Sequence, residues 1–168
     1  MAMGKRETEQ QQDLFITYDR LPRSPGHVFY QKLNGLLRDA DFDPWVENLC
    51  EPYYAGGRGR PSVPPGVYFR MLLVGYFEGI GSQRGIAWRC SDSLSLRDFL
   101  GIPQGEESPD HSSLSYIRNR LPLEVHQAVF VRILALAEEK KLLKGKTVAV
   151  DSTTLEANAA MKSIVRRD

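Results

Sequence analysis

The chain has 168 residues, of which 42% are hydrophobic, and its formal net charge at pH 7 is +1. This length allows one domain, or one domain with part of a second, and the apolar share is enough to build a buried core. The charge is too balanced to attract nucleic acid as a whole, and no apolar run reaches the roughly 18 residues of a membrane-spanning helix, so we expect a cytoplasmic protein without membrane contact.

The N-terminal part of the chain reads as an arm followed by helices. Residues 1–25 are polar and end at the second proline of the stretch LPRSPG, which predicts a flexible arm. Apolar residues then recur at helical spacing from Val28 to Ala40. A second helix is expected in DFDPW, with Asp43 as its N-cap and Pro44 as its first residue. We expect a helical domain over residues 26–143.

The middle of that domain is divided by glycine, proline and serine. The segment AGGRGRPSVPP breaks the chain, and the helix that follows it is apolar on nearly all sides until Gly79, which predicts the central helix of the core. Two short helices are expected next, with Ser82 and Ser93 as N-caps and Gly101 as the stop.

Two further helices are expected before the chain changes character. One begins in SPDHSSLSYIRNRL, with Asp110 or Ser112 as its cap, and is broken by Pro122. The other is long and amphipathic and extends from about Leu123 to Leu143. The fold class predicted for residues 26–143 is therefore mainly α.

Arginine supplies the cations in the middle of the chain, where residues 58–100 hold six arginines against three acidic residues. A guanidinium can bind phosphates and guanine edges with two parallel hydrogen bonds. The short helices are compatible with a helix-turn-helix, and the start of the Ser112 helix offers hydroxyl and N–H groups to phosphates. The alternative is a helical bundle with a solvated arginine face. The predicted DNA-contacting residues are Arg58, Arg60, Arg84, Arg89, Arg97, Ser112, Ser113, Arg118 and Arg120.

The stretch GRGRP, which contains Arg58 and Arg60, is a separate candidate. Two arginines around a glycine can lie in a narrow A·T-rich minor groove, where the negative potential is deepest. The alternative is a flexible connection before the central helix.

The last part of the chain, KGKTVAVDSTTLEANA, contains a short β-prone run that ends at Asp151. Residues 144–168 predict a strand or hairpin, for which the chain provides no partners of a full sheet. A carboxylate held rigidly at a strand end suits a Mg²⁺ ligand. The alternative is an aspartate that caps the turn formed with Ser152 and Thr153. Glu156 either pairs with Asp151 or is a surface residue.

Together these motifs resemble the N-terminal part of bacterial insertion-sequence transposases of the DDE type. The stretches GRPSVPPGVYFRMLLVGYFEGIGSQRGIAWRCSDSLSLRDFLGI, SPDHSSLSYIRNRL and GKTVAVDSTTLEANA carry the resemblance, in the family's order. It implies a helical DNA-binding domain before an RNase H-like catalytic domain, DNA strand transfer with Mg²⁺, and Asp151 as the first catalytic acid and metal ligand. It also implies transposon terminal repeats as partners and a bacterial, nucleoid-associated location.

The sequence departs from that family's pattern in its acidic residues. The family's second aspartate and its glutamate lie much further along the chain, whereas Glu156 is too close and Asp168 is the last residue. We therefore expect a fragment that binds DNA, is inactive alone and holds no metal by itself. The alternatives are a non-catalytic regulatory module that pairs with a full-length transposase or with itself as a dimer, and an inactive truncated gene product.

Overall fold

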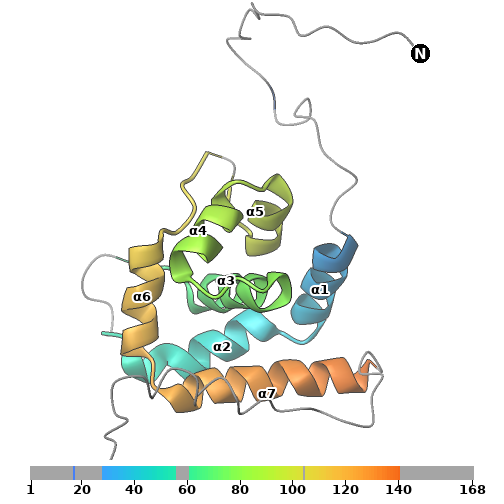
Figure 1. Cartoon of the computed structure of the whole chain (residues 1–168). Helices are drawn as coiled ribbons and strands as arrows, with labels where there is room; N and C mark the ends of the chain where they lie inside the picture. The colour runs from blue at the N-terminus through green and yellow to red at the C-terminus, as the bar shows by residue number, and fades with distance from the viewer. Residues whose placement is uncertain (1–16, 18–27, 56–60, 104, 141–168) are drawn as a thin grey trace, which may run out of the picture. The chain divides into compact units, whose positions relative to one another are not determined.

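The computed structural model describes residues 17, 28–55, 61–103 and 105–140, which form α-helices and one short 3-10 helix and contain no strand (Figure 1). The elements are α1 (Val28–Asp39), α2 (Phe42–Cys50), η2 (Glu51–Tyr53), α3 (Pro65–Glu78), α4 (Gln83–Ser91), α5 (Leu94–Leu100), α6 (His111–Arg120) and α7 (Leu123–Glu139). The prediction of a mainly helical chain is confirmed for these residues. The predicted arm over residues 1–25, apart from residue 17, and the predicted strand over residues 144–168 lie outside them.

Compactness divides the chain into two units, Met1–Ile133 and Leu134–Asp168. The first unit contains α1 to α6 and most of α7, and the features below belong to it. None of the described helices combines the length and the apolarity that a membrane crossing requires.

The central helix of the core is α3, as its sequence predicts (Figure 1). It buries residues on nearly all sides, among them Tyr68, Met71 and Val74. The helix ends at Gly79, whose φ of 68° is left-handed and is tolerated because glycine has no Cβ. A Cβ placed on Gly75 would lie 2.5 Å from Ile86 Cδ1, so this glycine allows α3 and α4 to pack closely.

The predicted caps of the short helices are confirmed. Ser82 Oγ accepts a hydrogen bond from the N–H of Gly85 at 3.1 Å, and Ser93 Oγ accepts one from Leu96 at 3.4 Å. Gly101 ends α5 with a φ of 70°. Each cap satisfies helix-end groups that have no partner inside the helix.

The start of α2 differs from its prediction. The N-cap position is occupied by Asp41, with a φ of 48°, and the helix begins at Phe42 instead of Pro44. Asp43 does not cap this helix, because its Oδ2 accepts a hydrogen bond at 2.7 Å from the Nη2 atom of the buried Arg70. The ion pair connects α2 to α3, and sequence spacing alone does not reveal it.

The start of α7 is attached to α3 by a histidine. His126 Nδ1 lies 3.0 Å from the carbonyl oxygen of Pro122, and its Nε2 lies 2.9 Å from Tyr68 Oη. Because a carbonyl oxygen only accepts, Nδ1 donates to Pro122, and the ring thereby connects the start of α7 to Tyr68 of α3. Val125 and Val129 of the same helix are buried in the core. The helix ends at Glu139, within the predicted range.

Candidate nucleic-acid interface

The helix α6 buries two apolar residues and presents polar ones to solvent. Leu114 and Ile117 are buried in the core. Its exposed residues are His111, Ser112, Tyr116, Arg118 and Asn119. The two buried residues hold the helix on the core, and the exposed side chains are of the types that read and hold DNA.

The first turn of α6 is closed by its own cap. Asp110 Oδ1 accepts hydrogen bonds from the N–H of Ser113 at 2.8 Å and from the hydroxyl of Ser112 at 2.9 Å. These bonds, led by the Ser113 N–H, hold the pKa of Asp110 below its usual range. The Ser113 N–H and the Ser112 hydroxyl, predicted to meet phosphate, are therefore engaged by a carboxylate whose charge repels phosphate.

Two arginines occupy the other end of α6. The Arg120 guanidinium carbon lies 4.7 Å from the ring centre of Tyr54 and 4.6 Å from that of Tyr116, and its Nη2 donates to Tyr116 Oη at 2.7 Å. Arg118 is exposed, and within the described part of the chain it has no hydrogen bond or ion pair. Charge therefore changes sign along the helix, from acidic at its start to basic at its end.

The start of α4 lies against α6. Ser115 Oγ donates to Gln83 Oε1, which connects the two helices. The next residue, Arg84, is exposed, as are Trp88 and Ser91 further along α4. The spacing of these three residues places them on one face of the helix. Arg84 thus adds a third arginine to those on α6, from a neighbouring element.

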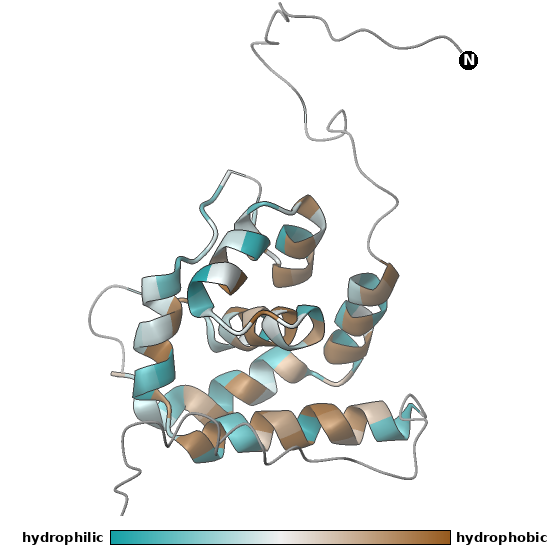
Figure 2. Ribbon diagram, viewed as in Figure 1, coloured by the Kyte–Doolittle hydropathy of each residue, from teal (hydrophilic) through white to brown (hydrophobic). Residues whose placement is uncertain are grey.

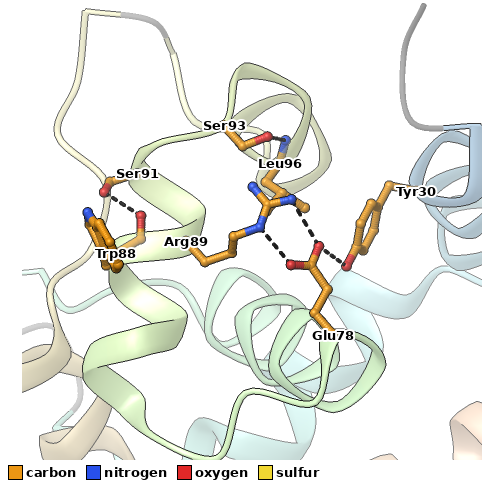
Figure 3. A network of polar contacts seen from close by, with 7 residues as sticks. All are labelled: Tyr30, Glu78, Trp88, Arg89, Ser91, Ser93 and Leu96. Carbon is orange, nitrogen blue, oxygen red and sulfur yellow. Dashed lines mark hydrogen bonds and ion pairs between the residues drawn. The ribbon is translucent and has the colours of Figure 1, made fainter. Parts of the chain in front are cut away.

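Two other predicted DNA contacts are used inside the domain. Arg89 donates from Nε to Glu78 Oε2 at 2.7 Å and from Nη2 to Oε1 at 3.3 Å, and Tyr30 also donates to Glu78 (Figure 3). Arg97 is buried on α5, where its Nη2 donates to the carbonyl oxygens of Pro103, at 2.9 Å, and Glu106. Their guanidinium groups serve the fold, so we leave both residues out of the candidate interface.

Beside α6 lies a cavity of about 1150 Å³. Ser112, Ser113, Tyr116 and Arg120 line one side of it, together with the acidic Glu107 and Asp110. Ala55 and Pro61, on either side of the Arg58 and Arg60 stretch, also line it. Arg58 and Arg60 themselves lie outside the described residues, and their contact with DNA stays a prediction.

No metal site is found in the described ranges, which contain no group of three or more histidine, cysteine, aspartate or glutamate residues that could hold an ion. Asp151, predicted as catalytic residue and metal ligand, lies outside these ranges. The structure therefore gives no geometry for Mg²⁺.

The predicted helix-turn-helix stays a prediction. A helix-turn-helix joins its two helices by about three or four residues. The connection from α5 to α6, Gly101–Asp110, is longer, whereas Gly79–Ser82 between α3 and α4 has the expected length.

Sequence reasoning did not identify the two tyrosines around Arg120. Tyr116 precedes Arg120 by one helical turn, so its spacing alone could have suggested the contact. Tyr54 is distant in sequence and reaches Arg120 only through folding.

A family model described as "Transposase domain (DUF772)" matches residues 17–120, which is more than half of the chain. The matched range contains α1 to α6 and therefore the whole candidate interface. Searches of curated proteins and of solved structures return no significant match.

Proposed function

Because the chain belongs to the family of transposase domains (DUF772), its function relates to transposition, and we propose that it binds duplex DNA at the ends of a mobile element. The observation that carries this proposal is the exposed, unpaired Arg118 at the basic end of α6. Because this guanidinium makes no hydrogen bond or ion pair to a described residue, redirecting it to a phosphate or a base edge breaks no such contact.

The proposed contact surface is the second half of α6 together with the start of α4. Arg118 and Arg84 supply charge, while Asn119 offers the amide that pairs with adenine in a major groove. Arg120 is held between two tyrosine rings and presents a preorganised cation at the edge of this surface. Asp110, the acidic N-cap of α6, lies at the opposite end of this helix from Arg118 and Arg120.

The test is a titration of the full chain against a labelled duplex from the element's ends, followed by fluorescence anisotropy at several salt concentrations. Arg118→Ala should weaken binding by roughly 1–3 kcal/mol if the side chain reads a base, and by less if it contacts only phosphate. Added salt should weaken binding of the wild type, because each phosphate contact releases counterions.

Arg38→Ala is the matched control. Arg38 is an exposed arginine at the end of α1, on the other side of the bundle from α6 (Figure 1). The substitution removes the same charge and should leave affinity almost unchanged. An equal loss of DNA affinity in the two variants would show that only the net charge matters, and it would refute the assigned surface.

Asp110→Asn gives an independent test of the same surface. Asparagine remains a good N-cap, so α6 should keep its start while losing a negative charge. We expect DNA affinity to rise about two- to threefold at low salt and to return to the wild-type value at high salt, because Debye screening shortens the repulsion. Unchanged affinity at low salt would place DNA elsewhere.

Catalysis is a separate proposal that rests on sequence alone. We carry forward Asp151 as a carboxylate ligand for Mg²⁺ in DNA strand transfer, as the resemblance to DDE transposases implies. Because we expect this chain to be inactive alone, the expected result with element-end DNA and Mg²⁺ or Mn²⁺ is no cleavage. Cleavage that is lost in Asp151→Ala would show that Asp151 acts within this chain and would contradict that expectation, whereas cleavage that survives the substitution would come from a contaminating nuclease. Binding of chromosomal DNA would place the protein at the nucleoid in the bacterial cytoplasm.

A further inference from the structure

The helix α7 is rich in apolar residues (Figure 2), of which only some pack on the core. Val125 and Val129 belong to the core, whereas Leu123, Phe130 and Val131 are exposed. The three exposed residues follow a spacing of i, i+7 and i+8, so they form a stripe along one side of the helix, with Gln127 at its middle.

The stripe continues onto α3 through aromatic contacts. The rings of Phe130 and Tyr76 lie 6.3 Å apart, and those of Tyr76 and Phe77 lie 5.4 Å apart. Both α3 residues are exposed. We call the surface formed by the following residues the aromatic patch: Tyr76, Phe77, Leu123, Phe130 and Val131.

The patch is large enough to matter energetically. Its members are exposed by 69%, 42%, 66%, 49% and 62% in that order. With roughly 150–200 Å² for each fully exposed side chain, they present on the order of 500 Å² of mostly apolar surface. A stable interface of standard size buries about 800 Å² on each partner, and homodimer interfaces are about 65% apolar. The patch therefore supplies nearly the whole apolar share that one copy needs.

The order of residues along α7 also fits a copy of the same surface. Leu123 and Val131 lie at equal distances before and after Gln127 in the sequence. When two such helices pack antiparallel about a two-fold axis at Gln127, Leu123 of each copy faces Val131 of the other. The two Gln127 side chains then meet and can hydrogen-bond to each other. The stripe itself contains no charge that this packing would bury.

We propose that the aromatic patch is a self-association surface, through which two copies of this chain pair with their α7 helices antiparallel about Gln127. This inference is independent of DNA binding, because the patch shares no residue with the α4 and α6 surface. It assigns Leu123, Phe130 and Val131 to the centre of the interface, with Tyr76 and Phe77 extending it over α3.

The first test is the mass of the full chain in solution without DNA, measured by sedimentation equilibrium from about 1 to 100 µM, a range chosen for interfaces of standard size. We expect a concentration-dependent change from 19.0 kDa to twice that mass. A monomer at every concentration overturns the proposal. Such a monomer would mean that the patch stays bare or that another segment of the chain covers it.

Variants locate the interface. Val131→Glu should raise the dimer dissociation constant at least tenfold, whereas Trp88→Glu, a matched change at an exposed aromatic outside the patch, should leave it unchanged. Gln127→Cys should form a disulfide-linked dimer under mild oxidation, while Ser91→Cys on α4 should not, and the native Cys50 and Cys90 are buried. Circular dichroism checks that each variant is folded. Two results would overturn the proposed surface: an unchanged dimer dissociation constant in Val131→Glu, or a dimer that is not cross-linked in Gln127→Cys.

Discussion

Arg97→Ala should destabilise the fold and leave the DNA surface intact, although Arg97 carries the same charge as the proposed DNA contacts. Its buried guanidinium donates to the carbonyl oxygens of Pro103 and Glu106. Both carbonyls belong to the segment Gly101–Asp110 that leads from α5 into α6. The substitution therefore removes two side-chain hydrogen bonds from α5 to that segment.

The expected magnitude follows from the environment of these bonds. Hydrogen bonds from a charged donor contribute about 1.5–3 kcal/mol each. Two effects reduce this loss. Pro103 and Glu106 are exposed, so water can hydrate their carbonyls after the substitution, and the variant no longer has the desolvation penalty of a buried charge. We therefore expect a net loss of about 2 kcal/mol, which corresponds to a melting temperature lower by about 6–10 °C for a domain of this size.

The assay is thermal unfolding by circular dichroism, with DNA anisotropy measured on the same preparations well below the melting temperature. Arg97→Lys keeps the charge, but the lysine side chain is shorter and does not place its ammonium where Nη2 of Arg97 donates to both carbonyls, so about half of the loss should remain. Arg38→Ala serves as the exposed control and should melt with the wild type. If Arg97→Ala melted normally and lost DNA affinity, the side chain would contact DNA and the structural role would be refuted.

Three further predictions concern packing and titration. Gly75→Ala should lower the free energy of unfolding by about 1–2 kcal/mol, because the steric clash of the new Cβ with Ile86 costs more than the higher helix propensity of alanine contributes. An unchanged free energy in a urea titration would mean that Ile86 repacks without cost. The hydrogen bond from the Ser113 N–H lowers the pKa of Asp110 in the folded protein. The ionised Asp110 side chain therefore stabilises the fold at pH values above the pKa of an unfolded aspartate, about 3.9. This stabilisation is lost as the pH falls through the lower pKa of the folded protein. Asp110→Asn should remove that part of the acid dependence, and identical acid unfolding curves would contradict it. Burial raises the pKa of Cys50 to about 11 and that of Cys90 to about 12, so both thiols should react slowly with a disulfide reagent at pH 8 until urea unfolds the chain; prompt labelling of the native protein would show that one of them is open to solvent.

Helix boundaries in this chain are largely decided by local chemistry, which is why the sequence predicts most of them. Ser82 and Ser93 cap helices with their own hydroxyls, and Gly79 and Gly101 end helices by taking left-handed backbone angles. These effects involve neighbours within a few residues. The apolar character of α3 on nearly all sides likewise predicts its central place in the core. The start of α2 was predicted wrongly because a distant partner, Arg70, engages Asp43.

The candidate interface could be predicted only in part. The sequence identifies arginines and serines as suitable for DNA, and it places Arg118 on a polar helix. It cannot distinguish Arg118 and Arg84 from Arg89 and Arg97, because all four are helical arginines among polar and apolar neighbours. The sequence also does not show that Asp110 engages both serines at the start of α6, because Ser112 is an equally suitable N-cap residue.

The sequence by itself therefore determined the helical class, most helix ends and the family, all of which depend on residue types at short spacings or in a fixed order. Only the tertiary structure decided which charges are available to a partner. Glu78 of α3 engages Arg89, the carbonyls before α6 engage Arg97, and Arg118 makes no hydrogen bond or ion pair to a described residue. The same packing left the aromatic patch on the surface. Burial and pairing depend on which elements meet, and residues far apart in the sequence meet only once the chain has folded.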